Sequence, residues 1–387
     1  MLNALCLLLS ATTAVAQERP AYPAPAEGRV VVHREQPFLE SGGERFTFDL
    51  YRPAGNETVP VVIVANVGSR SYGTWQGYIA LANAFADSGM AAVIYQAGQG
   101  KAPEHYDAVI ARLRERAPEL RIDPTRVVLW AGSSNVTVGL PIAMDRSRDH
   151  IRGLILYYGY AETPQIRTDL PVLFVRAGLD STQLNQAADR LILRALAANA
   201  PWTIENYGSG YHGFDAMEDS VLSREIVRRT IQFAGSVVRP QLTQAFAASA
   251  ADAALGAAFA RGEWDEAIAG YRKKTAEAPG DAEAHRRLGL ALMERQSYVE
   301  ALTSLERAWE LGRRGPRDTG YPAARAAALA GNVERSLHWL EVILKTPFGP
   351  PLDDLRKSPE FARVRSDQRF EQLLVRIEEE RRAKGKG

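Results

Sequence analysis

In the first two-thirds of the chain, short apolar runs alternate with longer amphipathic stretches. Runs such as 60–65 and 127–130 are apolar throughout, which is typical of strands buried on both faces of a sheet. Strands that alternate with helices predict an α/β fold with a mostly parallel central sheet, covered by helices on both faces. The expected strands are 30–32, 46–51, 60–65, 90–95, 127–130, 153–158, 171–175 and 202–206, and the expected helices include 75–88, 103–116, 182–198 and 221–237.

The stretch 126–136, RVVLWAGSSNV, places two serines between a predicted strand and an amphipathic segment. In a nucleophile elbow, a serine lies on a strained strand-to-helix turn, with small residues two positions before and after it because the two backbones nearly touch. Choosing Ser133 places Ala131 and Asn135 at these positions, where the usual pattern has two glycines. Choosing Ser134 instead would place a β-branched valine in the crowded turn. Ser133 is therefore the predicted nucleophile, and Ser134 is its rival.

A nucleophilic serine needs an acid and a base, which follow it in the order serine, acid, histidine in this architecture. His212 lies just beyond a late predicted strand in a glycine-rich loop, YGSGYHGF, and is the predicted base. Asp180 follows the strand at 171–175 and is the predicted acid, which would hold the imidazole tautomer and stabilise the imidazolium. Capping of the following helix by Asp180 or Ser181 is the alternative role, and Glu162 is the alternative acid.

An oxyanion hole requires two preorganised N–H donors. The backbone N–H of Ser134 is expected to be one, and the backbone N–H of Val67 or Gly68, after the strand at 60–65, to be the other. Arg70 is a candidate for binding a substrate carboxylate, with a solvated surface position as the alternative. The six histidines form no metal-ligand spacing, so neither a metal nor another cofactor is expected. The full set of candidate substrate-binding residues is Arg70, Tyr72, Trp75, Tyr211 and Phe214.

Residues 28–238 resemble α/β-hydrolases, and most of all the dienelactone hydrolase branch. The segments that carry the resemblance are PVVIVANVG, RIDPTRVVLWAGSSNV, PVLFVRAGLD and YGSGYHGF. The resemblance implies that the serine, aspartate and histidine singled out above form a catalytic triad. Dienelactone hydrolases use a cysteine nucleophile, and many serine relatives have His-Gly where this chain has Asn66-Val67. Hydrolysis of an acyl ester, rather than of a lactone, is therefore the expected reaction.

After a predicted linker at 239–250, the alternation of strands and helices ends. The segments WDEAI, YVEAL and VERSL place small residues at Ala267, Ala301 and Ser336, which are 34 and 35 positions apart (301 − 267 and 336 − 301). A period near 34 residues resembles that of tetratricopeptide (TPR) repeats. The resemblance implies a TPR-like helical domain at 251–387, ended by a capping helix, that binds a protein or peptide. A stabilising cap on the hydrolase domain and a contact between two copies of the chain are the alternatives.

The first 16 residues combine an apolar stretch with an Ala14-Val15-Ala16 cleavage pattern and predict a secretory signal peptide, with an uncleaved membrane anchor as the alternative. A flexible segment is expected at 17–27, which is rich in Pro and Ala. Cleavage would give a secreted or periplasmic protein without cysteine and without a membrane attachment. A net charge of +1 over 387 residues argues against a dedicated nucleic-acid binder.

Two functions are consistent with the sequence. The first is an exported serine hydrolase that cleaves a small acyl ester through a covalent acyl-enzyme, with a helical module for a protein or peptide partner. The second is a catalytically weak or inactive hydrolase-like protein that acts as an interaction scaffold. The complete order of serine, aspartate and histidine favours the first, and the substitutions at Asn135 and Asn66-Val67 favour the second.

Overall fold

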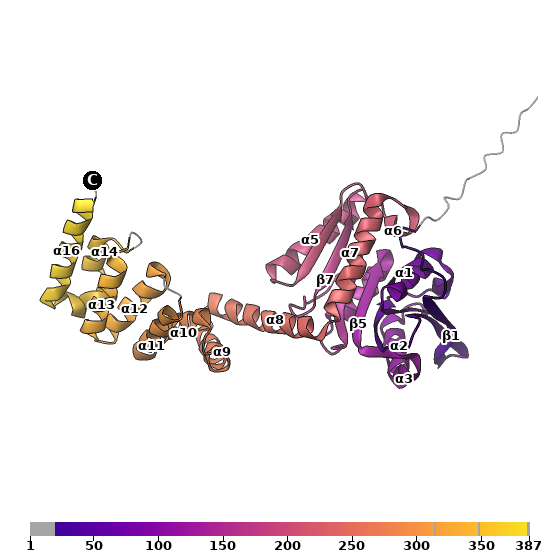
Figure 1. The fold of residues 1–387 in the computed structure, drawn as a ribbon, viewed down its shortest axis with the longest axis horizontal. Coiled ribbons are helices and arrows are strands. Elements are labelled where there is room, and N and C mark those ends of the chain that lie inside the picture. The colour runs from indigo at the N-terminus through magenta and orange to yellow at the C-terminus, as the bar shows by residue number, and fades with distance from the viewer. Residues whose placement is uncertain (1–19, 313–314, 347–348, 385–387) are drawn as a thin grey trace, which may run out of the picture. The chain divides into compact units, whose positions relative to one another are not determined.

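The computed structural model describes residues 20–312, 315–346 and 349–384. The chain divides into two compact units, one ending at Ala251 and the other beginning at Asp252, and Figure 1 labels several elements of each. The signal peptide predicted at 1–16 lies outside the described residues. No helix in the described part of the chain has both the length and the apolar character needed to cross a membrane.

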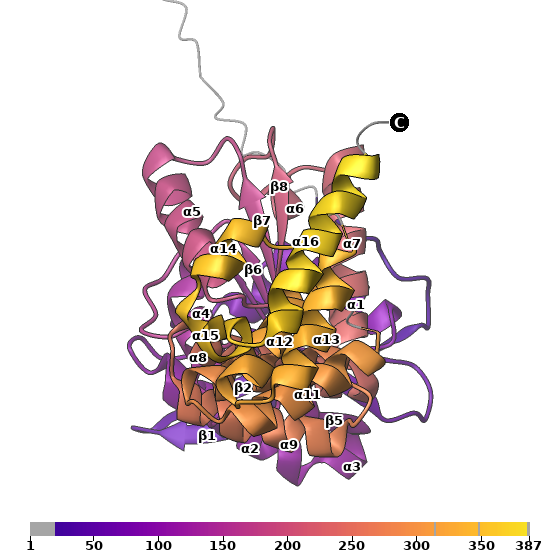
Figure 2. The same cartoon turned by 90° about the vertical axis from the view of Figure 1, so that its left-hand side faces the viewer.

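The first unit is built on one eight-stranded sheet with the order β1-β2-β4-β3-β5-β6-β7-β8. β2 is antiparallel to both of its neighbours, whereas all pairs from β4 to β8 are parallel. Figure 2 shows β6, β7 and β8 in succession. This order defines the α/β-hydrolase fold that the sequence predicts. The strands are β1 (Val30–Ser41), β2 (Glu44–Pro53), β3 (Val59–Val64), β4 (Ala91–Tyr95), β5 (Ile122–Gly132), β6 (Ile151–Tyr157), β7 (Val172–Ala177) and β8 (Trp202–Tyr207).

Helices cover both faces of this sheet. α1 and α7 pack on the face that carries Val62 and Val64. α2, α4 and α5 pack on the face that carries Val61 and Ile63. Successive residues of β3 thus enter two different cores, as the twofold repeat of a strand requires. The helices are α1 (Gln76–Asp87), α2 (Ala102–Glu115), α3 (Ala117–Leu120), α4 (Val136–Met144), α5 (Thr182–Ala197), α6 (Phe214–Met217) and α7 (Val221–Val237), with 3-10 turns η1 (Tyr72–Thr74) and η2 (Ser133–Asn135).

The predicted strands and helices of this unit are all present, and the largest differences are in the lengths of β1 and β5. β1 has 12 residues, because a tight turn at Gly42 and Gly43, both with positive φ, lets the whole strand pair with β2. β5 has 11 residues, because its polar start, IDPTR, is drawn into pairing with β3. The pattern of apolar residues marks only the buried part of such strands.

The strand order changes direction between β3 and β5, which are neighbours although β4 lies between them in the sequence. The chain leaves β3 towards β4 on one side and returns as β5 on the other. Loops that leave two such strands in opposite directions open a crevice at the carboxyl ends of the strands. Asn66 follows β3 and Ser133 follows β5, so the predicted oxyanion loop and the predicted nucleophile share this crevice.

Residues 20–24 run along the first unit between α1 and α7. The sequence predicts a flexible segment at 17–27, but Ala21 and Tyr22 are buried in the core that α1 and α7 share. The Ala21 N–H donates a hydrogen bond to the backbone oxygen of Asp215 at 2.8 Å. At these two residues the segment packs on the core, whereas Pro23 and Ala24 are exposed.

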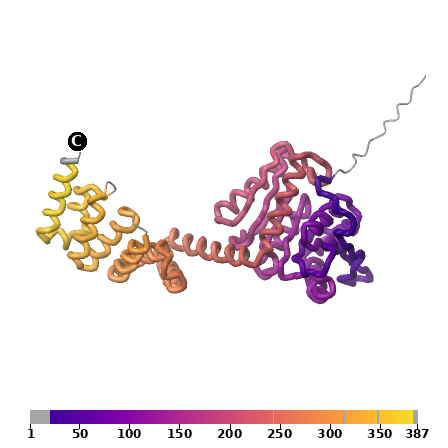
Figure 3. The backbone as a smooth tube through the Cα atoms, viewed as in Figure 1, coloured from indigo at the N-terminus to yellow at the C-terminus, as the bar shows by residue number. Residues whose placement is uncertain are grey.

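The described residues of the second unit are helical apart from short connections. α8 begins before the unit boundary, so the predicted linker at 239–250 is helical. Successive helices pack on one another (Figure 3), and the small residues Ala267, Ala301 and Ser336 are buried. The helices are α8 (Pro240–Ala260), α9 (Trp264–Glu277), α10 (Ala282–Glu294), α11 (Tyr298–Glu310), α12 (Tyr321–Leu329), α13 (Val333–Leu344), α14 (Leu352–Lys357), α15 (Ala362–Arg365) and α16 (Gln368–Lys384), with a π-helical turn η3 (Pro316–Gly320) and a 3-10 turn η4 (Pro359–Phe361).

α4 lies close to the sheet because Gly139 has no side chain. A Cβ at this position would lie 2.5 Å from the Cβ of Ala131 and 3.3 Å from that of Ala65. We expect Gly139→Ala to lower the free energy of unfolding by about 1–3 kcal/mol, because the helix must shift. Gly235→Ala in α7, where a Cβ has open space, is the control and should be neutral or stabilising by up to about 1 kcal/mol. Urea unfolding measures both, and a Gly139→Ala protein as stable as the wild type would contradict the close approach.

Candidate active site

The elbow forms where β5 ends at Gly132 and η2 leads into α4. Ser133 has a φ of 55°, a left-handed conformation that is rare outside glycine and is a form of strain found at functional turns. Ser134 does not share this positive φ. The chain after β6 lies close to the elbow at Gly159. A Cβ at this position would lie 2.5 Å from the Ser133 carbonyl oxygen, so a glycine is needed there. The backbone therefore places Ser133, rather than Ser134, at the strained position of the elbow.

Ser133, His212 and Asp180 form one hydrogen-bonded chain. The Ser133 Oγ lies 2.7 Å from His212 Nε2, and His212 Nδ1 lies 2.5 Å from Asp180 Oδ2. Because a carboxylate only accepts, Nδ1–H donates to Asp180 and leaves Nε2 to accept the serine proton. The Asp180 side chain is 8% exposed and that of His212 is 42% exposed, so the acid is buried while the imidazole reaches solvent.

The loops after β7 and β8 hold Asp180 and His212 together. A Cβ on Gly178 would lie 2.2 Å from the Gly208 carbonyl oxygen, so the two backbones are in direct contact. The Gly178 N–H donates to Tyr207 O at 2.8 Å, and the Leu179 N–H donates to Gly210 O at 2.9 Å. These bonds extend the pairing of β7 with β8 as far as the residues just before Asp180.

The alternatives weighed from the sequence have other positions. Ser134 is exposed, and its carbonyl oxygen accepts a hydrogen bond from the Thr137 hydroxyl. The Glu162 carboxylate is exposed and accepts from the Tyr160 hydroxyl, so it does not take the place of Asp180. Ser181 caps α5 through its hydroxyl, which accepts from the third residue of the helix at 3.3 Å. Capping and imidazole binding are therefore divided between two adjacent residues.

The two loop amides predicted for the oxyanion hole already have acceptors within the protein. The Val67 N–H donates to Asn135 Oδ1 at 3.0 Å, and the Gly68 N–H donates to Asn66 Oδ1 at 2.9 Å. The prediction of Val67 or Gly68 as an open donor is therefore not met in this structure, because side-chain amide oxygens occupy both N–H groups. The Ser134 amide, in η2, is the predicted donor that lies next to the nucleophile.

Asn135 replaces the glycine of the usual pattern without crowding the elbow. Its side chain is buried, and its Nδ2 donates to the Tyr78 hydroxyl at 2.9 Å and to the Tyr72 hydroxyl. Tyr72 donates in turn to the Ala65 carbonyl oxygen at 2.9 Å. Burial raises the pKa of Tyr78 to about 12, so this hydroxyl stays protonated at neutral pH. Asn135 thus joins the elbow to the loop after β3.

A cavity of about 670 Å³ opens over Ser133. Tyr72 and Trp75, which were predicted to bind substrate, do line it. Arg70 does not, because it pairs with Glu44 at 2.6 Å and lies over the Phe46 ring. The described residues that line the cavity are Val67, Ser69, Ser71, Tyr72, Thr74, Trp75, Tyr78, Gly132, Ser133, Ser134, Asn135, Tyr158, His212, Gly213 and Met217.

The two aromatic residues predicted to flank the base are also absent from this lining. Tyr211 points to solvent with 63% of its surface exposed, and Phe214 is fully buried against Tyr157 and Tyr207. The two residues are the first and last of one turn, in which the Phe214 N–H donates to the Tyr211 carbonyl oxygen at 3.2 Å, and only Phe214 enters the core. The apolar wall beside His212 is formed instead by Tyr158, whose ring centroid lies 4.8 Å from that of the imidazole.

Tyr78, Tyr158 and Met217 are among the lining residues that the sequence analysis did not predict. Tyr78 lies one helical turn after Trp75, and that spacing is a signal that could have found it. Tyr158 follows the carboxyl end of β6, the sheet edge at which ligands bind in this class of fold. Met217 ends α6 and carries no signal in the sequence. Within the described residues, no group of three or more His, Cys, Asp or Glu side chains could hold a metal ion.

Comparison with known proteins finds no matching family model and no matching curated protein. Solved structures that are similar include an esterase from Rhizomucor miehei, with 14% identity over 56% of this chain and 86% of that chain and a TM-score of 0.46. A thermostable esterase from Pseudomonas putida has 16% identity over 55% and 84%, with a TM-score of 0.46. Brefeldin A esterase, a bacterial homologue of human hormone-sensitive lipase, has 16% identity over 58% and 81%, with a TM-score of 0.45. At these values the likeness carries no conclusion about activity, and the fold is assigned from the strand order.

The role of Asn135 in joining the elbow to the neighbouring loop is testable by restoring the usual glycine. We expect Asn135→Gly to lower the free energy of unfolding by about 1–3 kcal/mol, because it leaves two buried tyrosine hydroxyls and the partly buried Val67 N–H without this partner. Asn83→Ala is the control, since Asn83 bonds only within its own helix. Thermal unfolding measures both variants, and an Asn135→Gly protein that is no less stable than the control would refute this role.

Proposed function

We propose that the protein is a serine hydrolase that cleaves neutral carboxylic esters through a covalent acyl-enzyme. The observation that carries the proposal is the hydrogen-bonded chain from Ser133 through His212 to Asp180, on a strained elbow beneath an open cavity. A nucleophile, a base and a group that orients the base, all within hydrogen-bond reach, are the elements that nucleophilic catalysis requires.

In the first step, His212 Nε2 takes the Ser133 proton while Oγ attacks the ester carbonyl carbon. The resulting imidazolium is stabilised by Asp180, which lies 2.5 Å from Nδ1. Collapse of the tetrahedral intermediate breaks the bond to the leaving alkoxide, which receives the proton from Nε2. In the second step, His212 takes a proton from water, and the hydroxyl attacks the acyl-enzyme. Release of the carboxylic acid returns the proton to Ser133.

The developing oxyanion needs donors, and the Ser134 amide is the first that we assign. The second is the Val67 N–H, which the substrate oxygen must take over from Asn135 Oδ1. An oxyanion is a stronger acceptor than a neutral amide oxygen, so the exchange favours the tetrahedral state over the ground state. In the absence of the oxyanion, the hydrogen bond to Asn135 keeps the Val67 N–H in position.

The cavity lining supports a neutral substrate. The described lining contains no Lys, Arg, Asp or Glu. His212 is its one histidine. Tyr72, Trp75, Tyr78 and Tyr158 supply aromatic surface instead. A carboxylate on the substrate would lose water without gaining a cation, which is unfavourable. We therefore propose that the likeness to dienelactone hydrolases extends to the fold only. The substrate that we propose is a neutral ester and not a charged lactone.

For the rest of the chain we propose the roles predicted from the sequence. The buried small residues at a period near 34 support a TPR-like module that takes a protein or peptide partner. The signal-like start supports export to the periplasm or the medium, where a hydrolase without disulfides relies on its core for stability. A contact between two copies of the chain remains the alternative use of the helical unit.

A second function, an inactive hydrolase-like scaffold, is favoured by one observation. The amides of Val67 and Gly68 are both occupied by side-chain oxygens, so the oxyanion hole is closed in the structure. If Asn135 never releases the Val67 N–H, only one donor serves the oxyanion, and loss of one donor costs about 100- to 1,000-fold in rate.

A fluorophosphonate probe separates the two functions. We expect it to form an adduct on Ser133 of the wild type, located by mass spectrometry of peptides, because the His212 base activates this hydroxyl. Ser133→Ala should lose labelling and lower ester hydrolysis by about a thousandfold or more. Ser134→Ala is the matched control and should keep its label. A folded wild type that gains no adduct would support the scaffold instead.

The charge of the acyl group tests the neutral-substrate proposal. We expect p-nitrophenyl butyrate to be hydrolysed with a kcat/KM about tenfold or more above that of mono-p-nitrophenyl succinate, which has the same leaving group but carries a carboxylate at the end of its acyl chain. Arg70→Ala should leave this ratio unchanged, because Arg70 pairs with Glu44 outside the cavity. Equal values for the two esters, or a ratio that changes in Arg70→Ala, would be evidence for cationic recognition.

A further inference from the structure

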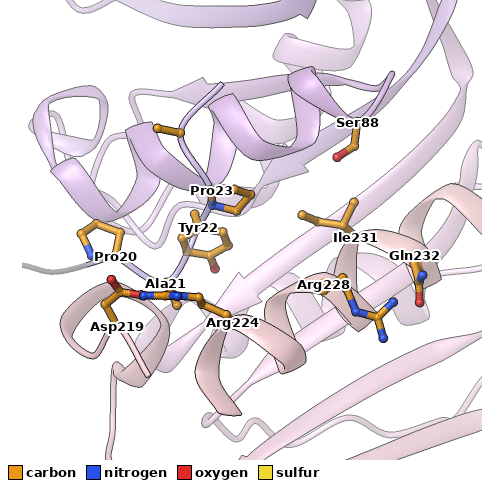
Figure 4. Close-up of a pocket in the computed structure, with 11 residues that line it drawn as sticks. Pro20, Ala21, Tyr22, Pro23, Ser88, Asp219, Arg224, Arg228, Ile231 and Gln232 are labelled. Atoms are coloured by element: carbon orange, nitrogen blue, oxygen red, sulfur yellow. The ribbon is translucent and has the colours of Figure 1, made fainter. Parts of the chain in front are cut away.

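The N-terminal segment is bonded to a carboxylate beneath the candidate active site. The Tyr22 hydroxyl donates to Asp215 Oδ2 at 2.6 Å, across 193 residues of sequence, and the Ala21 N–H donates to the Asp215 backbone oxygen at 2.8 Å. Figure 4 shows Tyr22 and Pro23 beside a cavity of about 610 Å³ that α7 lines with Arg228. The segment thus forms two hydrogen bonds with Asp215, one to its side chain and one to its backbone.

Asp215 lies three residues after His212, in α6, and is 2% exposed. Its other carboxylate oxygen accepts from the Tyr158 hydroxyl. Burial raises the pKa of this carboxyl group and of both tyrosines, so the two hydroxyls stay protonated and act as donors. A buried carboxyl group with two tyrosine donors is well paired, and removal of either donor leaves it short of a partner.

Tyr158 contacts both Asp215 and the His212 imidazole. Its φ of 30° is unusual for a residue with a large side chain, so the surrounding contacts must hold it there. The ring lies 4.8 Å from the His212 imidazole, centroid to centroid, and lines the cavity over Ser133. The Asp215 hydrogen bond fixes the far end of the same ring.

We propose that Tyr22 and Asp215 form a buried clamp that positions Tyr158 and, through it, the His212 imidazole. The clamp also holds the backbone of the His212 loop through Ala21. The proposal rests on the hydrolase function above and adds the N-terminal segment to the working site. Tyr22 and Asp215 are positioning residues, because neither lines the cavity over Ser133.

The test compares kcat and KM for p-nitrophenyl butyrate in full-length variants. We expect Tyr22→Phe to lower kcat about tenfold with KM nearly unchanged, since a small displacement of the imidazole impairs proton transfer more than binding. Tyr106→Phe is the matched control, because it removes another buried hydroxyl, which forms a hydrogen bond with His150 at 3.0 Å in the core on the other face of the sheet. It should lower thermal stability without lowering kcat.

A double-mutant cycle checks the route through Tyr158. In a Tyr158→Phe background, Tyr22→Phe should lower kcat further by less than about twofold, because the connection is already broken. Asp215→Asn is the second variant for the case in which Tyr22→Phe does not fold, and it should also lower kcat. A folded Tyr22→Phe protein with wild-type kcat, or a full effect of Tyr22→Phe in the Tyr158→Phe background, overturns the clamp.

Fluorophosphonate labelling of the wild type distinguishes failure of the clamp from failure of the proposed function. A wild type that labels at Ser133 while Tyr22→Phe keeps full kcat overturns the clamp and leaves the hydrolase proposal standing. A folded wild type without a label on Ser133 overturns both proposals.

Discussion

The geometry of the site depends on the contact between the backbones of Gly178 and Gly208. No side chain fits between them, since a Cβ on Gly178 would lie 2.2 Å from the Gly208 carbonyl oxygen. Because the loops after β7 and β8 touch here, the acid and the base leave neighbouring strands in fixed positions. His212 Nδ1 then meets the buried Asp180 carboxylate at 2.5 Å. This hydrogen bond fixes the orientation of the imidazole, which is the arrangement that the proposed proton transfer requires.

Buried polar groups support this arrangement from two sides. On one side, Asn135 connects the elbow to the loop after β3 and to the hydroxyls of Tyr72 and Tyr78. On the other, the Asp215 carboxylate accepts hydrogen bonds from the hydroxyls of Tyr22 and Tyr158, near His212. Polar groups that are buried in this way hold a single geometry, because any other arrangement leaves donors or acceptors unpaired. The residue that replaces the usual elbow glycine is therefore part of the support of the site.

The sequence could predict the strands, the helices and the order of the three central side chains. Runs of apolar residues and glycine-rich turns act locally, and the parallel order brings the loops after β5, β7 and β8 to one edge of the sheet. Loop side chains were harder to place. Arg70 turns to Glu44 and Phe46, and Tyr211 and Phe214 turn to opposite sides of one turn. Their directions depend on neighbours that no local pattern reveals.

The sequence by itself determined the α/β architecture and the positions of Ser133, Asp180 and His212, because each of these follows from a local signal and from strand order. Only the tertiary structure decided which backbone amides already have an acceptor and which contacts hold the His212 imidazole. The Val67 N–H finds its acceptor 68 residues away, and the Tyr22 hydroxyl finds its carboxylate 193 residues away. Hydrogen bonds at such separations are made by packing of the whole domain, which leaves no periodicity in the sequence to read.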